Sequence, residues 1–225
     1  MTKDPNKILV VQVNWLGDIM FTTPFLQALK DRYPKSHIAC MVHPRCVPML
    51  ENNPFISELI PFDEKSSQKT LFNKIRFIGR LREKHFDQAY FLHRSFTRLL
   101  LAALSGIPER IGFKRVKTDW LLTKYINEPE NIRHKVHRFL RLCDDNLEHK
   151  YPDYIFESSD EDRKNADKIL DECGLKESTC IFAINPGANW EPKRWPWKNF
   201  AELANRLTDE FGADIIITGA KKDVE

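Results

Sequence analysis

The sequence predicts an α/β fold in which parallel sheets form two successive domains. Apolar, β-branched runs alternate along the chain with longer segments of helical periodicity, the order expected of repeated βα units. These runs are continuously apolar, as is typical of strands buried on both faces of a parallel sheet. The alternation is interrupted once, by a polar and acidic stretch, and then resumes, which indicates a second domain of the same class.

The first domain opens with a clear βα unit. Residues 8–13 (ILVVQV) predict a buried strand, residues 14–17 a turn, and residues 18–33 a helix in which Pro24 causes a kink or a late start. The same rhythm predicts strands at 37–42, 56–61, 87–92 and 110–113, and helices at 48–51, 69–84, 96–104 and 133–147. Crossovers between parallel strands are expected to be right-handed.

The second domain is expected to follow a connection at residues 150–160. The acidic stretch 157–172 ends at Gly174, a typical residue after a helix C-terminus. The elements expected next are a strand at 179–185, a loop at 186–196, a helix at 197–211 and a strand at 213–218. Two strands and one helix cannot cover both faces of a parallel sheet, so we expect the chain to end inside this domain.

Composition argues against several classes of protein. The 225 residues are 42% hydrophobic and 30% charged, enough to bury a core. Lys and Arg total 35 against 32 acidic residues, and this near balance predicts no nucleic-acid partner. The five cysteines form no CxxC pair, which predicts reduced thiols in a cytoplasmic protein. The apolar runs at residues 8–13 and 99–104 are too short for a signal peptide or a membrane span.

The turn after the first strand is the first candidate site. Asp18 follows Asn14–Gly17 at the carboxyl end of that strand, where open α/β sheets bind ligands. A carboxylate there can act as a general base, or it can be an N-cap or first-turn acid that stabilises the helix by about 1 kcal/mol. The turn holds one glycine and no GxGxxG, which argues against a nicotinamide-dependent oxidoreductase.

The loop at residues 185–196 (NPGANWEPKRWP) is the second candidate. Gly187 permits close approach of the backbone, and Lys193 and Arg194 precede the N-terminus of the next expected helix. Free N–H groups and the helix dipole favour anions at that point, so the loop suits a diphosphate. The alternative is an ordinary loop with two solvated cations and packing tryptophans.

Two further patterns remain ambiguous. Residues 65–84 carry seven Lys and Arg against one acid, Glu83, with apolar residues at helical spacing. Such a helix either lies on an anionic membrane surface or covers the sheet with a solvated basic face, and the latter is the simpler interpretation. His134 and His137 lie three residues apart without a carboxylate at metal-ligand spacing, so no metal site is predicted.

Two long motifs resemble those of a known family. VQVNWLGDIMFTTPFLQALKDRYP (residues 11–34) and INPGANWEPKRWPWKNFAELANRL (184–207) are similar, in order and spacing, to motifs of the bacterial lipopolysaccharide heptosyltransferases, glycosyltransferase family nine. The intervening FLHRSFTRLLLAALSGIPERIGF and HKVHRFLRL also resemble family segments. The resemblance implies a GT-B fold: an acceptor-binding domain at residues 1–155, a linker at 156–177, and the start of a nucleotide-sugar domain at 178–225.

The resemblance also implies a reaction. It is an inverting transfer of heptose from ADP-heptose to the lipid A–core oligosaccharide, without metal or cofactor. Asp18 matches the family's catalytic base, and Lys193, with Gly187 and Ala188, matches the loop that meets the donor phosphates. Expected acceptor contacts are Arg94, Ser95, Arg110 and His134. The acceptor implies a peripheral position on the inner-membrane surface of a Gram-negative bacterium.

One departure from the family pattern leaves an alternative open. Family members continue beyond the strand expected at residues 213–218 and supply contacts to adenine, ribose and heptose. We therefore expect this chain to be part of a longer protein. The alternative is a truncated, non-catalytic remnant that only binds lipopolysaccharide precursors or a membrane surface.

Overall fold

The chain forms two compact units, Met1–Ser158 and Ser159–Glu225. The computed structural model describes residues 4–114, 119–128, 134–144, 153–175, 177–188 and 190–220. The division after Ser158 falls in the expected interdomain connection, and it places the helix at residues 160–172 in the second unit. The functional domain ranges 1–155, 156–177 and 178–225 stay a prediction.

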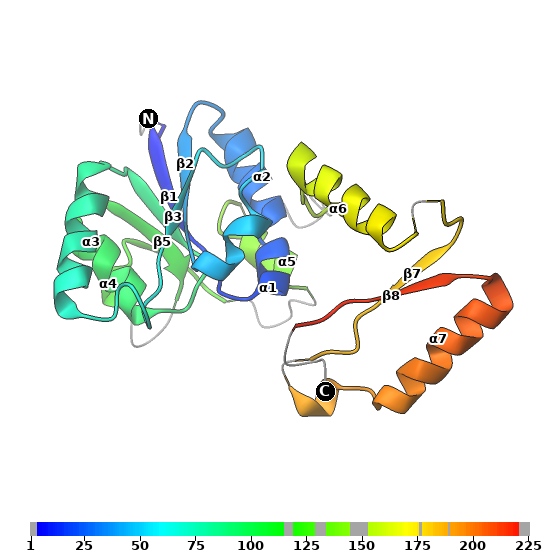
Figure 1. Ribbon diagram of the computed structural model, residues 1–225. Coiled ribbons are helices and arrows are strands. Elements are labelled where there is room, and N and C mark those ends of the chain that lie inside the picture. The colour runs from blue at the N-terminus through cyan, green and yellow to red at the C-terminus, as the bar shows by residue number, and fades with distance from the viewer. Residues whose placement is uncertain are drawn as a thin grey trace. The chain divides into compact units, whose positions relative to one another are not determined.

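The first unit is built on a six-stranded parallel sheet of order β3-β2-β1-β4-β5-β6 (Figure 1). The strands are β1 (Lys7–Val11), β2 (His37–Val42), β3 (Glu58–Pro61), β4 (Gln88–Phe91), β5 (Glu109–Phe113) and β6 (Lys124–Ile126). The strand order reverses between β1 and β4, which lie side by side although the chain forms β2 and β3 between them. The expected parallel α/β class is confirmed for this unit.

Helices cover both faces of this sheet. On one face lie α1 (Leu16–Met20), α2 (Thr23–Arg32) and α5 (Lys135–Leu140), and on the other α3 (Leu71–Glu83) and α4 (Phe96–Leu104) (Figure 1). The continuous apolar sequence of β1 follows from this arrangement. Ile8 and Val10 pack in the core under α2 and α5, whereas Leu9 and Val11 pack in the core under α3 and α4.

The single helix expected at residues 18–33 is two helices, α1 and α2. The break comes just before Pro24, which lies in the first turn of α2, where its missing N–H costs nothing. The Thr22 hydroxyl donates a hydrogen bond of 2.7 Å to the carbonyl of Ile19, which satisfies one acceptor freed at the end of α1. The kink expected from Pro24 is therefore confirmed as a complete interruption.

Other boundaries differ from those expected. The first strand ends at Val11, two residues early, and the short helix expected at 48–51 is a 3₁₀ helix, η1, at Pro44–Met49. The helix expected at 133–147 is limited to α5. His134 caps its start, and residues 141–143, just after its end, form a turn. Residues 133 and 145–147 of that expectation lie outside the described residues. Strand β6 and the 3₁₀ helix η2 (Asp119–Leu121) were not expected.

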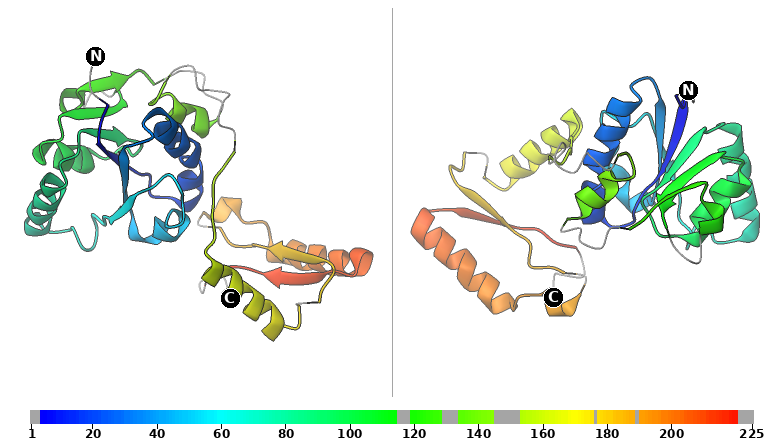
Figure 2. Two further views of the ribbon diagram at one scale, coloured as in Figure 1. Left: turned by 90° about the horizontal axis from the view of Figure 1, so that it is seen from above. Right: turned by 180° about the vertical axis from the view of Figure 1, so that it is seen from behind.

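The second unit holds two parallel strands, β7 (Ile181–Ile184) and β8 (Asp214–Ile217), with α7 (Trp197–Phe211) beside them (Figure 2). Helix α6 (Asp160–Glu172) precedes the strands and begins with a capping box: the Ser159 hydroxyl accepts from the Asp162 N–H, and the Asp162 carboxylate accepts from the Ser159 N–H. Gly174 follows α6 with a positive φ of 72°, as expected at a helix C-terminus.

Candidate functional site

The site begins at the carboxyl edge of the six-stranded sheet. All six strands are parallel, so their carboxyl ends share one edge, and the loops after β1 and β4 lie next to each other where the strand order reverses. Ligands of open α/β sheets bind at such a point. Asp18 follows β1, and Arg94 and Ser95 follow β4.

Asp18 lies in the first turn of α1, but it does not cap the helix. The N-cap residue is Trp15, and no side chain makes a capping hydrogen bond there. The Asp18 carboxylate instead accepts a 2.7 Å hydrogen bond from the ammonium of Lys135, at the start of α5. Its side chain keeps 26% of its surface exposed, so the carboxylate is held by a cation and is still reachable from solvent.

Aromatic side chains stand beside this ion pair. The Lys135 ammonium lies 5.8 Å from the ring centroid of Phe21, and the His134 ring packs edge-on against the same ring at 5.1 Å. His134 Nδ1 accepts from the Val136 N–H and so caps α5, while its Nε2 lies 3.4 Å from the Tyr154 hydroxyl. His134, an expected acceptor contact, thus packs against Phe21, the ring that also lies near the Lys135 ammonium.

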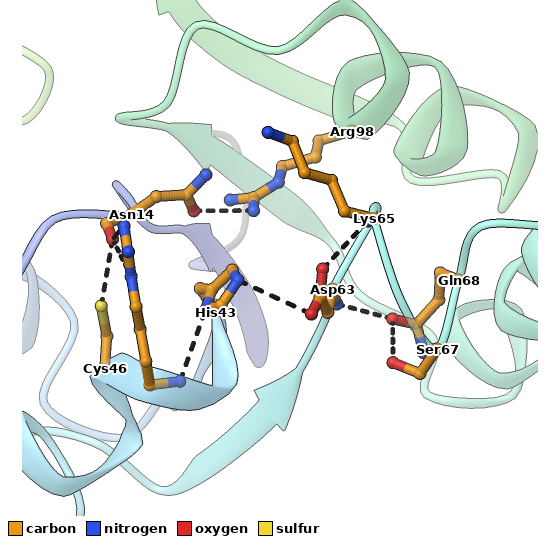
Figure 3. A network of polar contacts seen from close by, with 9 residues as sticks. Asn14, His43, Cys46, Asp63, Lys65, Ser67, Gln68 and Arg98 are labelled. Atoms are coloured by element: carbon orange, nitrogen blue, oxygen red, sulfur yellow. Dashed lines mark hydrogen bonds and ion pairs between the residues drawn. The ribbon is translucent and has the colours of Figure 1, made fainter. Parts of the chain in front are cut away.

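The turn that carries Asp18 is fixed by Arg98, which the sequence did not single out. Arg98 lies on α4, is only 1% exposed, and donates a 2.8 Å hydrogen bond to the Gln12 carbonyl. It donates a second bond of 2.8 Å to Asn14 Oδ1 (Figure 3). Burial lowers the pKa of Arg98 from its ordinary value. A signal was present in the sequence: the apolar Leu101 and Ala102 follow Arg98 by three and four residues, so Arg98 shares the apolar side of its helix.

The polar network continues to the loops after β2 and β3. Arg45 donates to the Asn14 carbonyl at 3.0 Å, and its guanidinium stacks 4.5 Å from the ring centroid of Trp15. His43 Nε2 lies 3.7 Å from the carboxylate of Asp63 (Figure 3). The loops after three neighbouring strands are therefore joined by hydrogen bonds and ion pairs around the turn that leads to Asp18.

His93 adds an unusual titratable group to the loop after β4. Burial, together with the positive charge of Arg98, lowers the pKa of His93 to about 4. Among the described residues its Nδ1 has no hydrogen-bond partner although it is buried. The imidazole is therefore neutral at pH 7, and adding a proton there would place two cations close together.

Arg94 and Ser95 have partners of their own. Arg94 forms an ion pair with Glu128, whose carboxylate also lies 2.7 Å from Nε of Arg138 on α5. The Ser95 hydroxyl accepts from the N–H of Arg98 and caps α4. Both residues line a small cavity of about 50 Å³ at the carboxyl end of β4. The guanidinium of Arg94 and the hydroxyl of Ser95 thus lie at the expected edge of the sheet.

Arg110 is not brought to that edge. It is the second residue of β5, near the amino end of the strand, and its guanidinium donates to backbone carbonyls, including that of Leu121 at 2.6 Å. It also donates to the carbonyls of Ile107 and Pro108. These bonds give Arg110 a structural role near the amino end of β5, and its contact with an acceptor stays a prediction.

In the second unit, the loop expected to bind phosphate joins β7 to α7. Lys193 ends the 3₁₀ helix η3 (Glu191–Lys193), and its ammonium lies 5.8 Å from the ring centroid of Trp190. Arg194 folds back and donates a 3.0 Å hydrogen bond to the carbonyl of Ala188. Gly187 comes directly before Ala188 in the same loop. Pro196 is the N-cap residue of α7. The loop therefore presents cations just before a helix N-terminus.

The described residues form neither a metal-binding cluster nor a membrane-spanning helix. They hold no group of three or more His, Cys, Asp or Glu side chains arranged to bind a metal ion. Within the same residues, every helix is too short or too polar to cross a bilayer. All five cysteines are free thiols, and burial raises the pKa of Cys40 and of Cys143 to about 12.

Comparisons with known proteins agree with the resemblance of the two motifs. The chain is 29% identical to lipopolysaccharide heptosyltransferase 2 of Escherichia coli K12, over 97% of this chain and 65% of that protein. It superposes on a glycosyl transferase family 9 structure from Veillonella parvula with a TM-score of 0.90 and 25% identity, over 100% of this chain and 66% of that one.

The structure of E. coli ADP-heptose LPS heptosyltransferase II gives a TM-score of 0.77 and 29% identity, over 96% of this chain and 65% of that chain. These matches confirm the expected GT-B class. The family model described as glycosyltransferase family 9 (heptosyltransferase) matches residues 74–225. The chain therefore belongs to glycosyltransferase family 9, the heptosyltransferases.

Proposed function

We propose that this chain is the acceptor domain and the beginning of the donor domain of an inverting heptosyltransferase. It transfers heptose from ADP-heptose to the inner core of lipopolysaccharide, on an acceptor of the heptosyl-Kdo-lipid A type. Family membership and the similarity to the E. coli enzyme named for ADP-heptose support this proposal. The chain spans 65% of that relative's length, so the activity is proposed for the protein that contains it.

The Asp18–Lys135 pair is the observation that carries the proposal. In the reaction, a hydroxyl oxygen of the acceptor sugar attacks the anomeric carbon of the donor heptose. The bond from that carbon to the diphosphate oxygen breaks, and ADP leaves with the electron pair. The hydroxyl proton moves to the Asp18 carboxylate, which is solvent-accessible, and the Lys135 ammonium orients that carboxylate from 2.7 Å.

The departing diphosphate needs positive charge. We assign that role to Lys193, because its loop offers an ammonium and the N-terminus of α7 to the same anion. Gly187 and Ala188 belong to the same loop and are assigned to the donor phosphates with it. With the charge supplied by the protein, we expect turnover to persist in the presence of EDTA.

The acceptor contacts are proposed at the sheet edge of the first unit. His134 stands beside the catalytic pair, and Arg94 and Ser95 follow β4. Arg94 suits a phosphorylated core sugar, since a guanidinium binds phosphate in a bidentate manner. With an acceptor anchored in lipid, the enzyme would act at the cytoplasmic face of the inner membrane.

The proposal is tested with purified protein, ADP-heptose and a lipid A–core acceptor. We expect Asp18→Asn, which keeps shape but cannot take the proton, to lower kcat by roughly 10²–10⁴-fold. Lys135→Gln should lower kcat less, since Lys135 positions the base and does not touch the proton. Asp167→Asn, on an exposed turn of α6, is the matched control and should leave kcat unchanged.

Two results would overturn the assignment. Unchanged kcat in the Asp18→Asn variant would remove Asp18 as the base. Acceptor binding by calorimetry with no transfer, in the wild-type chain and also in a version extended to the length of its relatives, would favour the non-catalytic remnant.

A further inference from the structure

Helix α3 carries two separate sets of apolar side chains. The first set, Phe77 and Leu81, is 2% and 1% exposed and packs in the core against the sheet. Phe77 contacts Phe62 with ring centroids 4.8 Å apart. These residues satisfy the requirement of a crossover helix to cover its sheet.

The second set has no such explanation. Leu71, Phe72 and Ile75 are 74%, 73% and 58% exposed. At about 100° per residue these three side chains share an arc of about 100°, on the side of the helix opposite to Phe77 and Leu81. Scattered exposed apolar residues are normal, but a group of large ones on one helix face marks an interaction surface. The simpler interpretation, a helix that covers the sheet and has a solvated basic face, is confirmed by the packing of Phe77 and Leu81 and by the exposed basic residues, but it does not account for this second apolar group.

Basic side chains surround the apolar group. Lys69, Arg76, Arg80 and Arg82 are all exposed, and Glu83 is the only acid between residues 65 and 84. Arg76 and Arg80 lie one turn apart and, with Ser67, Gln68 and Asn73, line a groove of about 360 Å³. The groove thus presents two guanidinium groups and neutral hydrogen-bonding side chains close to the exposed apolar group.

We propose that this face of α3 docks on a bilayer that contains anionic phospholipid. Leu71, Phe72 and Ile75 enter the boundary between headgroups and acyl chains, and the groove at Arg76 and Arg80 receives a headgroup phosphate. A second copy of the chain is disfavoured as the occupant, because a two-fold interface would bring this basic face against itself. The proposal does not depend on the transferase chemistry.

Vesicle flotation tests the proposal without donor or acceptor. Wild-type protein should bind vesicles of phosphatidylethanolamine and phosphatidylglycerol, bind phosphatidylcholine vesicles much more weakly, and lose affinity as salt increases. The triple variant Leu71→Gln, Phe72→Gln, Ile75→Gln should bind anionic vesicles at least about tenfold more weakly. Arg76→Gln with Arg80→Gln should also lose about tenfold at low salt.

Matched controls separate docking from general effects. Ile169→Gln and Arg206→Gln change exposed residues of α6 and α7 and should bind as wild type does. The altered α3 residues are exposed, so circular dichroism should show an intact fold in every variant. Asp18→Asn should bind vesicles normally, which distinguishes failure of this proposal from failure of the proposed catalysis.

Three outcomes would overturn the docking surface. These are equal binding to anionic and neutral vesicles, unchanged binding by the triple variant, and no flotation of wild-type protein. Sedimentation that shows a dimer, lost in the triple variant, would identify a second copy as the occupant and refute the bilayer.

Discussion

The buried guanidinium of Arg98 should stabilise both the first unit and the turn that carries Asp18. The perturbation is Arg98→Met, which keeps the bulk of the side chain and removes its two hydrogen bonds to Gln12 and Asn14. In the variant, the Gln12 carbonyl and Asn14 Oδ1 each lose a charged donor at 2.8 Å.

The magnitude follows from these contacts. A hydrogen bond to a charged group contributes about 1.5–3 kcal/mol, so two give about 3–6 kcal/mol before any offset. Removing the guanidinium also relieves the cost of burying it, a cost visible in the lowered pKa of Arg98. We expect a net loss of about 2–4 kcal/mol in the free energy of unfolding.

Urea denaturation followed by circular dichroism measures this loss. A double-mutant cycle with Asn14→Ala should give a coupling of about 1–2 kcal/mol, because the two side chains share a hydrogen bond. Arg206→Met is the control: its ion pair with Glu210 is exposed, so its loss should be below about 0.5 kcal/mol. An Arg98→Met variant as stable as wild type, or a coupling near zero, would refute this reasoning.

Three other predictions concern separate parts of the fold. Because the pKa of His93 is lowered to about 4 from 6.5, the unfolded chain binds more protons than the folded one between these values. The free energy of unfolding should therefore fall by about 1 kcal/mol from pH 7 to pH 5, after discounting for the partial exposure of His93. Urea denaturation of wild type and of His93→Gln at each pH measures this, and the variant should lack the loss. Ser159→Ala should cost about 1 kcal/mol by removing one half of the capping box with Asp162, and an unchanged urea midpoint would show that α6 does not need the cap. Gly112→Val should cost about 1–3 kcal/mol, since a Cβ at Gly112 already lies 3.2 Å from Leu122 Cδ2, and a raised melting temperature would show that this side chain moves aside freely.

Elements with strong local patterns could be predicted from sequence. The strand at 37–42 and the helices at 96–104 and 197–211 agree with the structure residue for residue. Strand β6 could not be predicted, because its three residues are too few to show a pattern. It exists because its backbone pairs with β5, where Phe113 lies opposite Ile126.

In the candidate site, too, local features could be predicted from the sequence and contacts between distant residues could not. The position of Asp18 followed from a strand end and a motif, both of which are local in sequence. Its partner Lys135 comes from α5, and no pattern within a window connects the two. Arg98 was missed because a cation in a helix is ordinarily solvated. Its burial is made tolerable by its hydrogen bonds to the Gln12 carbonyl and the Asn14 side chain and by the nearby carboxylates of Asp63 and Glu64.

The ion pair between Asp18 and Lys135 joins residues 117 positions apart in the chain. Its two helices, α1 and α5, are the first and last of the five α-helices described in the first unit, so a long loop of chain closes when they meet. Contacts of such long range form late, because the entropy of closing a long loop is lost before they contribute. The Asp18–Lys135 pair would therefore form only once the first unit had folded cooperatively, and the formation of this ion pair would report that folding was complete.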